Sequence, residues 1–170
     1  MKYDYITLYN KVSGVLREKP RFVKGIRIFN KVCTLLFLVL YGGFVAYAVV
    51  RKFAPLTLVR ILGAPALCLF LVTVLRYVIN RPRPYSERGA GISPLHEKKA
   101  QDYSFPSRHT ACAFVIAMTV LPYAVWLGVP LLILASALAF SRFALGLHYP
   151  SDILAGAGMG ILCGLAGIFF

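Results

Sequence analysis

Residues 130–152 read PLLILASALAFSRFALGLHYPSD, an apolar block that ends in an arginine, a histidine and a carboxylate. Arg142 lies more than one helical turn inside the block, and His148 and Asp152 lie at its end. Placing an arginine inside a membrane span costs roughly 2.5–3.5 kcal/mol on insertion scales, so an ionisable residue there indicates a functional site. The stretch therefore predicts a membrane helix with a functional site at one end.

Apolar blocks of similar length occupy most of the remaining chain. The 170 residues are 59% hydrophobic, and a helix of about 20 apolar residues crosses a bilayer. We expect an all-α polytopic membrane helix bundle with about five spans: residues 32–50, 54–75, 110–129, 130–147 and 153–170. Pro122 predicts a kink in the third span. Glycines in the last span predict close helix packing: Gly156, Gly158, Gly160, Gly164 and Gly167.

The first 31 residues form a basic amphipathic segment that precedes the transmembrane domain of residues 32–170. Tyr5, Leu8 and Val12 recur at helical spacing and predict a short helix over residues 4–16, which Lys19-Pro20 ends. A second basic amphipathic piece follows, and we expect both pieces to lie at the membrane interface. Eight Lys and Arg side chains here would contact anionic lipid head groups, each contributing about 1 kcal/mol.

Net charge and hydropathy together limit the classes of binding partner that the protein can have. A formal charge of +13 is typical of proteins that bind phosphate backbones, but the apolar blocks argue against a nucleic-acid partner. The composition instead predicts an integral membrane protein. Its oligomeric state is left open by the sequence.

The long polar connection over residues 77–108 carries a second polar cluster where it leaves the second span. Arg76 and Arg83 are seven positions apart, so they would share a helix face if the helix continued. Pro82 and Pro84 fix the chain as it leaves the membrane, and guanidinium groups bind phosphate oxygens bidentately. A basic juxtamembrane anchor is the alternative interpretation.

A third polar cluster begins the third span. Ser107 follows a proline and precedes an apolar helix, so it is expected to be the N-cap, with His109 in the first turn. Free N–H groups at a helix N-terminus bind anions. A routine cap followed by an interfacial histidine is the simpler alternative.

The cluster at the end of residues 130–152 carries the most specific chemistry. Pro150 must stop the helix, which places Asp152 in the first turn of the next helix, close to His148. An imidazole held by a carboxylate through one ring nitrogen presents the other as a base, nucleophile or metal ligand. Several nearby arginines would repel a metal cation, so phosphate is the favoured ligand and no metal is predicted.

These clusters resemble the three signature motifs of the type-2 phosphatidic acid phosphatase family, membrane lipid phosphatases related to vanadium haloperoxidases. The third motif is complete, with Ser141, Arg142, His148 and Asp152. The first has Arg76 where the family has lysine, followed by Arg83-Pro84. The second reads Pro106-Ser107-Arg108-His109, with arginine in place of the family's glycine.

The resemblance implies roles for these residues. His148 would attack the phosphorus, Asp152 would orient it, and His109 would protonate the leaving lipid oxygen, with no metal or other cofactor. The phosphoryl oxygens would be held by Arg76, Arg83, Arg142, Ser107 and Arg108, the last through its backbone N–H. The substrate would be a phosphorylated membrane lipid such as undecaprenyl diphosphate, phosphatidylglycerol phosphate or phosphatidic acid. The competing hypothesis is a catalytically silent protein that binds anionic lipid.

Two arguments about the membrane side of the site conflict. Two spans separate the N-terminus from the loop over residues 77–108, so both lie on one side. That side holds fifteen Lys and Arg residues, against Arg51 and Lys52 opposite, and the positive-inside rule then predicts a cytoplasmic site. The resemblance implies an outward-facing site.

Overall fold

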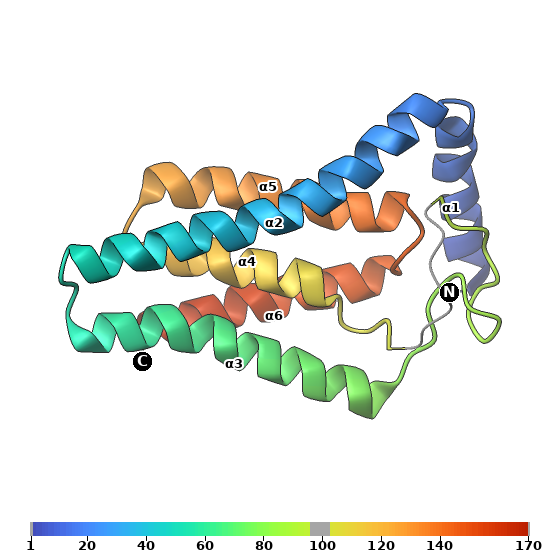
Figure 1. The fold of residues 1–170 in the computed structure, drawn as a ribbon. Helices are drawn as coiled ribbons and strands as arrows, with labels where there is room; N and C mark the ends of the chain where they lie inside the picture. Colours follow the sequence, from blue (N-terminus) through green and yellow to red (C-terminus); the bar gives the residue numbers. More distant parts are fainter. Residues whose placement is uncertain (1, 96–102, 170) are drawn as a thin grey trace.

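The computed structural model describes residues 2–95 and 103–169, with side chains from residue 5 onward. Its regular elements in these ranges are the helices α1 Lys2–Arg17, α2 Pro20–Val50, α3 Pro55–Ile79, α4 Arg108–Val120, α5 Val125–Ala144 and α6 Pro150–Phe169. Helices α2 to α6 run side by side along one direction, and α1 lies across one end of them (Figure 1). The predicted all-α helix bundle is confirmed.

Four of the helices, α2, α3, α5 and α6, are long and apolar enough to cross a membrane. The chain is therefore an integral membrane protein. The remaining apolar helix, α4, has only 13 residues, which is about 20 Å at 1.5 Å per residue. It lies within the bundle and contacts α2, α3, α5 and α6. The third predicted span, residues 110–129, is thus a short central helix.

The predicted boundary between the third and fourth spans is wrong. The third span was expected to run to residue 129, but α4 ends at Val120 and residues 121–124 form a turn. Pro122 thus lies in a break between helices, and Pro130 lies inside α5. The close approach of Gly128 to Leu121 holds this turn, because an added Cβ would lie 2.5 Å from the Leu121 Cα.

The second basic amphipathic piece and the first span form one uninterrupted helix, α2. Pro20 occupies its first turn, where a missing N–H costs nothing, so Lys19-Pro20 separates α1 from α2 as predicted. The helix then runs for 31 residues to Val50. Basic side chains near the start of α2 are therefore fixed relative to its membrane-spanning part.

Helix α1 buries part of its apolar face against the protein. Tyr9 is fully buried, and its hydroxyl donates a hydrogen bond to the Ser93 carbonyl (3.1 Å). Arg17 Nη2 donates to the same carbonyl (2.7 Å). Gly146 has φ of +73° and packs on the Tyr9 ring, where an added Cβ would lie 2.7 Å from the hydroxyl oxygen. The location of α1 at the membrane interface stays a prediction.

Close helix packing at the glycines of α6 is confirmed at four of the five positions. A Cβ added at Gly160 would lie 2.5 Å from the Ala111 carbonyl oxygen, and one at Gly164 would lie 2.3 Å from the Met118 Cβ. Gly156 and Gly167 are equally close to neighbouring helices, whereas Gly158 has nothing within 4 Å. The backbone of α4 therefore lies directly on α6.

Candidate functional site

The polar clusters predicted from the sequence meet at the end of the bundle where α3 ends, α4 begins and the α5–α6 link lies (Figure 1). Asn80 adopts a left-handed conformation (φ 42°) and ends α3. Arg83 therefore lies beyond the helix and does not share a helix face with Arg76, because the helix does not continue. It reaches the site because the chain turns back, and its Nη1 lies 3.5 Å from the Leu147 carbonyl oxygen.

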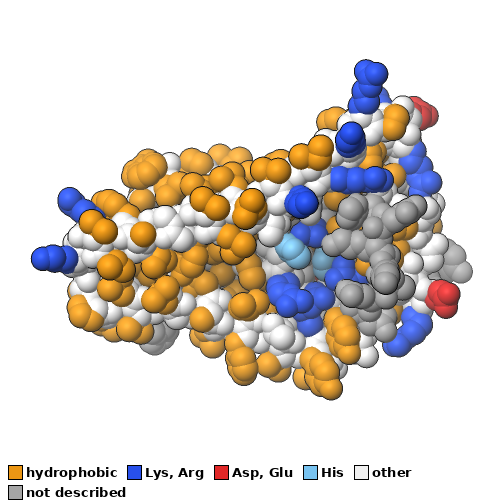
Figure 2. Space-filling model, viewed as in Figure 1, with side chains coloured by type: hydrophobic (Ala, Val, Ile, Leu, Met, Phe, Trp, Pro, Cys, Tyr) orange, Lys and Arg blue, Asp and Glu red, His pale blue; other side chains and the backbone are white. Residues whose placement is uncertain are grey.

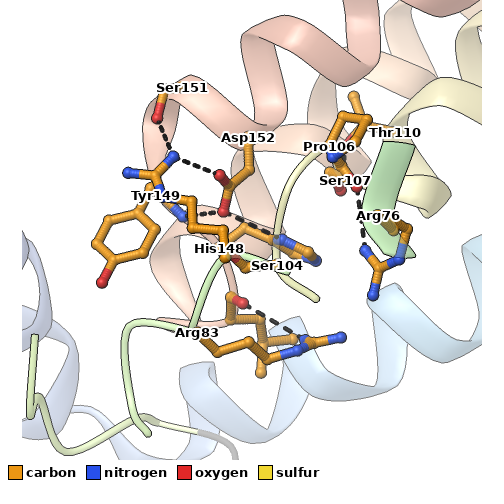
Figure 3. Close-up of polar contacts among 12 residues, drawn as sticks. Arg76, Arg83, Ser104, Pro106, Ser107, Thr110, His148, Tyr149, Ser151 and Asp152 are labelled. Atoms are coloured by element: carbon orange, nitrogen blue, oxygen red, sulfur yellow. Dashed lines mark hydrogen bonds and ion pairs between the residues drawn. The ribbon is translucent and has the colours of Figure 1, made fainter. Parts of the chain in front are cut away.

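His148 and Asp152 form a buried pair. The α5–α6 link carries His148, and Pro150 begins α6, so that Asp152 lies in its first turn as predicted. His148 Nδ1 lies 3.5 Å from Asp152 Oδ2, and the side chains are 2% and 0% exposed. Figure 3 shows the imidazole and the carboxylate facing each other. The distance is longer than a well-formed hydrogen bond, and the arrangement leaves Nε2 as the nitrogen away from the carboxylate.

Arg81, which the sequence argument did not select, holds the other side of the Asp152 carboxylate. Its Nη1 lies 2.7 Å from Asp152 Oδ1 and also donates to Ser151 Oγ (2.7 Å). Its guanidinium stacks on the Tyr149 ring, 4.1 Å from the centroid, and the Tyr149 N–H donates to Asp152 Oδ2 (3.0 Å). The sequence feature that could have indicated Arg81 is the run Arg-Pro-Arg-Pro, in which Arg81 precedes Arg83 by two residues.

The N-terminus of α4 lies against this pair. Ser107 is at the N-cap position as predicted, but its hydroxyl makes no capping bond and instead accepts from Thr110 Oγ1 (3.0 Å). The Ser107 N–H donates to the Asp152 backbone carbonyl (2.9 Å). The Ser107 backbone packs on Gly156, where an added Cβ would lie 2.6 Å from the Ser107 carbonyl oxygen. The positive end of α4 is thereby fixed beside Asp152.

The first turn of α4 has N–H groups that the helix does not use. Its first backbone hydrogen bond runs from the Ala111 N–H to the Ser107 carbonyl (3.0 Å). The N–H groups of the preceding residues, Arg108 to Thr110, therefore lack helical acceptors. Arg76, from the last turn of α3, donates through Nη1 to the Pro106 carbonyl (3.0 Å) and so lies beside this turn (Figure 3).

Buried arginines surround the pair with positive charge. Arg76 and Arg142 are 8% and 4% exposed, and the charges of Arg83 and Arg142 both act on His148. Among the residues that the structure describes, the Nε atoms of Arg83 and Arg142 are buried without a hydrogen-bond acceptor. Buried charged donors without acceptors are costly, so this arrangement favours an anionic ligand with several oxygens.

Burial sets the protonation state of His148. It lowers the pKa of the imidazole to about 4, with the charges of Arg83 and Arg142 acting in the same direction and Asp152 opposing them. His148 is therefore neutral at pH 7, with a lone pair on Nε2. Within residues 2–95 and 103–169, no group of three His, Cys, Asp or Glu side chains is placed to hold a metal ion.

His109 and Arg108 lie toward the outer edge of the site. His109 is half-buried and Arg108 is exposed. His109 and Arg142 line one cavity of about 470 Å³ beside α2. Figure 2 shows histidine side chains in a hollow flanked by Lys and Arg side chains. The structure thus places all eight predicted site residues at one end of the bundle.

Comparison with known proteins agrees with the motifs. A family model described as the PAP2 superfamily matches residues 57–169. The Escherichia coli (strain K12) protein YbjG is 36% identical over 110 residues, which cover 64% of this chain and 52% of that protein. The undecaprenyl-diphosphatase BcrC of Bacillus subtilis (strain 168) is 34% identical over 101 residues, covering 59% of this chain and 48% of that protein.

The chain thus spans about half the length of the curated relatives it matches. Among solved structures, the fold is similar to that of LpxE from Aquifex aeolicus, with a TM-score of 0.75 and 23% sequence identity. That similarity covers 97% of this chain and 94% of the other. Because the family model matches more than half of the residues, and the three motifs meet at one end of the bundle, the chain belongs to the PAP2 superfamily.

Proposed function

We propose that this protein hydrolyses the terminal phosphate of a membrane lipid through a phosphohistidine intermediate on His148. The observation that carries the proposal is a buried neutral imidazole that faces Asp152 through Nδ1 and is surrounded by arginines. In the first step the Nε2 lone pair attacks phosphorus and the bond from phosphorus to the lipid oxygen breaks. His109 donates a proton to that oxygen, and the lipid leaves.

In the second step a water molecule attacks the phosphorus of the phosphohistidine. His109 takes a proton from the water, the N–P bond breaks, its electron pair returns to Nε2, and inorganic phosphate leaves. Positioned positive charge is the main source of catalysis in phosphoryl transfer. We assign that charge to Arg76, Arg83 and Arg142, together with Ser107 and the N–H of Arg108 at the α4 N-terminus. No metal ion takes part in this scheme.

The substrate class follows from the chemistry of the site and from the relatives. Undecaprenyl diphosphate, phosphatidylglycerol phosphate and phosphatidic acid all carry a terminal phosphate that this site would accept. BcrC is named an undecaprenyl-diphosphatase, which makes undecaprenyl diphosphate the first substrate to test. We further propose that the protein works in a bacterial plasma membrane and that the basic side chains of α1 and early α2 contact anionic head groups.

The test is phosphate release from these three lipids by the purified protein in detergent. His148→Ala should abolish turnover on every lipid that the wild type hydrolyses, while Arg51→Gln, at the opposite end of the bundle, should stay at the wild-type rate. An alkaline quench during turnover should trap a phosphoramidate in the wild type and none in His148→Ala. Activity of His148→Ala within tenfold of wild type, or loss of wild-type activity on adding a chelator, would contradict the proposal. Binding of these lipids without any turnover would favour the catalytically silent alternative.

A further inference from the structure

Two cavities beside α2 share residues with the site. The first, here called the cationic cavity, has a volume of about 470 Å³ and is lined by residues that include Arg27, Lys31, His109 and Arg142. The second, here called the apolar cavity, has a volume of about 290 Å³. Its lining includes Phe37, Leu38, Cys112, Ile116 and Leu138. Thr34 and His109 line both cavities, so the two adjoin at these side chains.

The cationic cavity receives positive charge from outside the three motifs. Lys31 and Arg27 lie one turn apart on α2, and no acidic side chain lines the cavity among the residues that the structure describes. Arg27 is already engaged, because its Nε donates to the Leu95 carbonyl (2.8 Å) and its Nη2 donates to the same oxygen. Lys31 makes no hydrogen bond or ion pair with the residues that the structure describes. Its ammonium group is therefore available to an anion.

His109 fixes how a lipid substrate would extend through the two cavities. In the proposed reaction His109 protonates the oxygen that leaves phosphorus, so that oxygen lies where the two cavities meet. If the substrate is a diphosphate, this oxygen belongs to the second phosphate, and Lys31 in the cavity lining supplies positive charge for that phosphate. The hydrocarbon chain would then continue between α2 and α4 through the apolar cavity.

From this geometry we propose that the cationic cavity is a subsite for the second phosphate of a diphosphate lipid and that Lys31 determines the preference for diphosphates. The inference rests on the proposed function and narrows its substrate class. In a phosphate monoester the leaving oxygen is bonded to carbon, so Lys31 has no phosphate to bind. Loss of the Lys31 charge should therefore affect diphosphates selectively.

The test compares two substrates with the same chain, farnesyl diphosphate and farnesyl monophosphate. Lys31→Gln should lower kcat/KM for the diphosphate about tenfold to a hundredfold, the effect of one hydrogen bond to a charged group. The monophosphate should change less than about threefold, since it makes no such bond. Lys31→Arg should keep the preference for the diphosphate. Lys52→Gln removes the same charge from an exposed position that lines neither cavity, so it should match the wild type.

Inhibition by inorganic anions provides a second readout that needs no lipid. Lys31→Gln should weaken inhibition by inorganic diphosphate and leave inhibition by phosphate unchanged. Equal loss on both farnesyl substrates, or no loss on either, would overturn the subsite while leaving the proposed phosphatase intact. If the wild type hydrolyses neither farnesyl substrate and none of the three lipids named above, the proposed function fails, and the subsite is then judged by direct binding of inorganic diphosphate to the wild type and Lys31→Gln. Equal affinity of the two would overturn it.

Discussion

Arg81 shows how one residue outside the predicted set supports the pair formed by His148 and Asp152. It holds the buried Asp152 carboxylate at 2.7 Å while its guanidinium stacks on Tyr149. Arg81→Gln should lower kcat about 10- to 100-fold, since a hydrogen bond to a charged group contributes about 1.5–3 kcal/mol. KM should change little, because Arg81 Nη1 is already bonded to Asp152 and Ser151 and is expected to act through Asp152. Arg81→Lys should recover only part of the rate, because an ammonium group lacks the planar stacking surface.

The separate measurement of kcat and KM distinguishes this role from phosphate binding. Arg83→Gln, two residues further on, should raise KM as well as lower kcat. Arg51→Gln, at the other end of the bundle, serves as the control for loss of charge. A rise in KM for Arg81→Gln with kcat unchanged would show that Arg81 binds substrate directly.

The buried His148 also predicts how stability depends on pH. Its pKa in the folded protein is about 4, below the value of about 6.5 expected in the unfolded chain. As pH falls below 6.5 the unfolded state binds the proton first, so the free energy of unfolding decreases toward pH 4. The slope contributed by this group is at most about 1.4 kcal/mol per pH unit. Thermal unfolding in detergent at pH 7, 5.5 and 4.5 should show this loss in wild type and a smaller loss in His148→Gln. An identical pH dependence in both proteins would contradict it.

At the residue scale, the sequence indicated which side chains would lie together, because motif spacing and helix ends are local features. Pro150 placed Asp152 beside His148, and Ser107 marked the start of α4. Arg81 and Lys31 were not predicted as part of the site, because the residues near them in space are remote in the sequence. Arg81 contacts Asp152, 71 positions away, and Lys31 lines a cavity with His109 and Arg142. A basic residue next to an apolar block reads as a head-group anchor unless its spatial neighbours are known.

The contact between α4 and α6 gives a prediction at the scale of elements. Gly156→Ala would place a Cβ 2.6 Å from the Ser107 carbonyl oxygen, so the start of α4 must shift. We expect a loss of about 1–3 kcal/mol of stability, as in overpacked cores. Activity should fall too, because the Ser107 N–H is bonded to the Asp152 carbonyl. Thermal unfolding and phosphate release both measure the effect.

The same helix provides a matched control. Gly158 has nothing within 4 Å of its added Cβ, so Gly158→Ala should stabilise α6 by about 0.5–1 kcal/mol through backbone entropy. Activity of Gly158→Ala should be unchanged. Equal behaviour of the two alanine variants would refute the claim that α4 lies directly on Gly156.

Helix ends could be predicted where a single proline marked them, but not where two nearby prolines each could have ended a helix. Pro20 and Pro150 each stand alone at a helix start, and both were placed correctly. Pro122 and Pro130 offered two breaks eight residues apart, and the sequence did not show which would end a helix. The packing of Gly128 on Leu121 favours the break at Pro122 and leaves Pro130 inside α5. Similarly, the periodicity of α1 does not distinguish a face that meets lipid from one that packs on Gly146.

For the whole molecule, the structure places α1 and the site at the same end of the bundle (Figure 1), as the count of spans required. The distribution of Lys and Arg then predicts that this end is cytoplasmic. In intact cells a membrane-impermeant maleimide should label Lys52→Cys and not Ser93→Cys, two exposed positions at opposite ends. The unsubstituted protein, with its four free cysteines, is the control. Labelling of Ser93→Cys alone would show that the site faces outward and that catalytic arginines biased the charge count.

The shortness of α4 has a consequence for how a bilayer surrounds this protein. Phe53 and Tyr123 pack together at the end away from the site, with ring centroids 5.7 Å apart, and aromatic side chains favour the level of the head groups. Measured from that level, α4 extends about 20 Å, so its Arg108 end lies about 10 Å short of the far side of a hydrocarbon layer about 30 Å thick. Under the proposed function, the scissile bond would then lie below the membrane surface. The lipid would enter the protein sideways by a short distance, and water and free phosphate would have to cross the remaining depth.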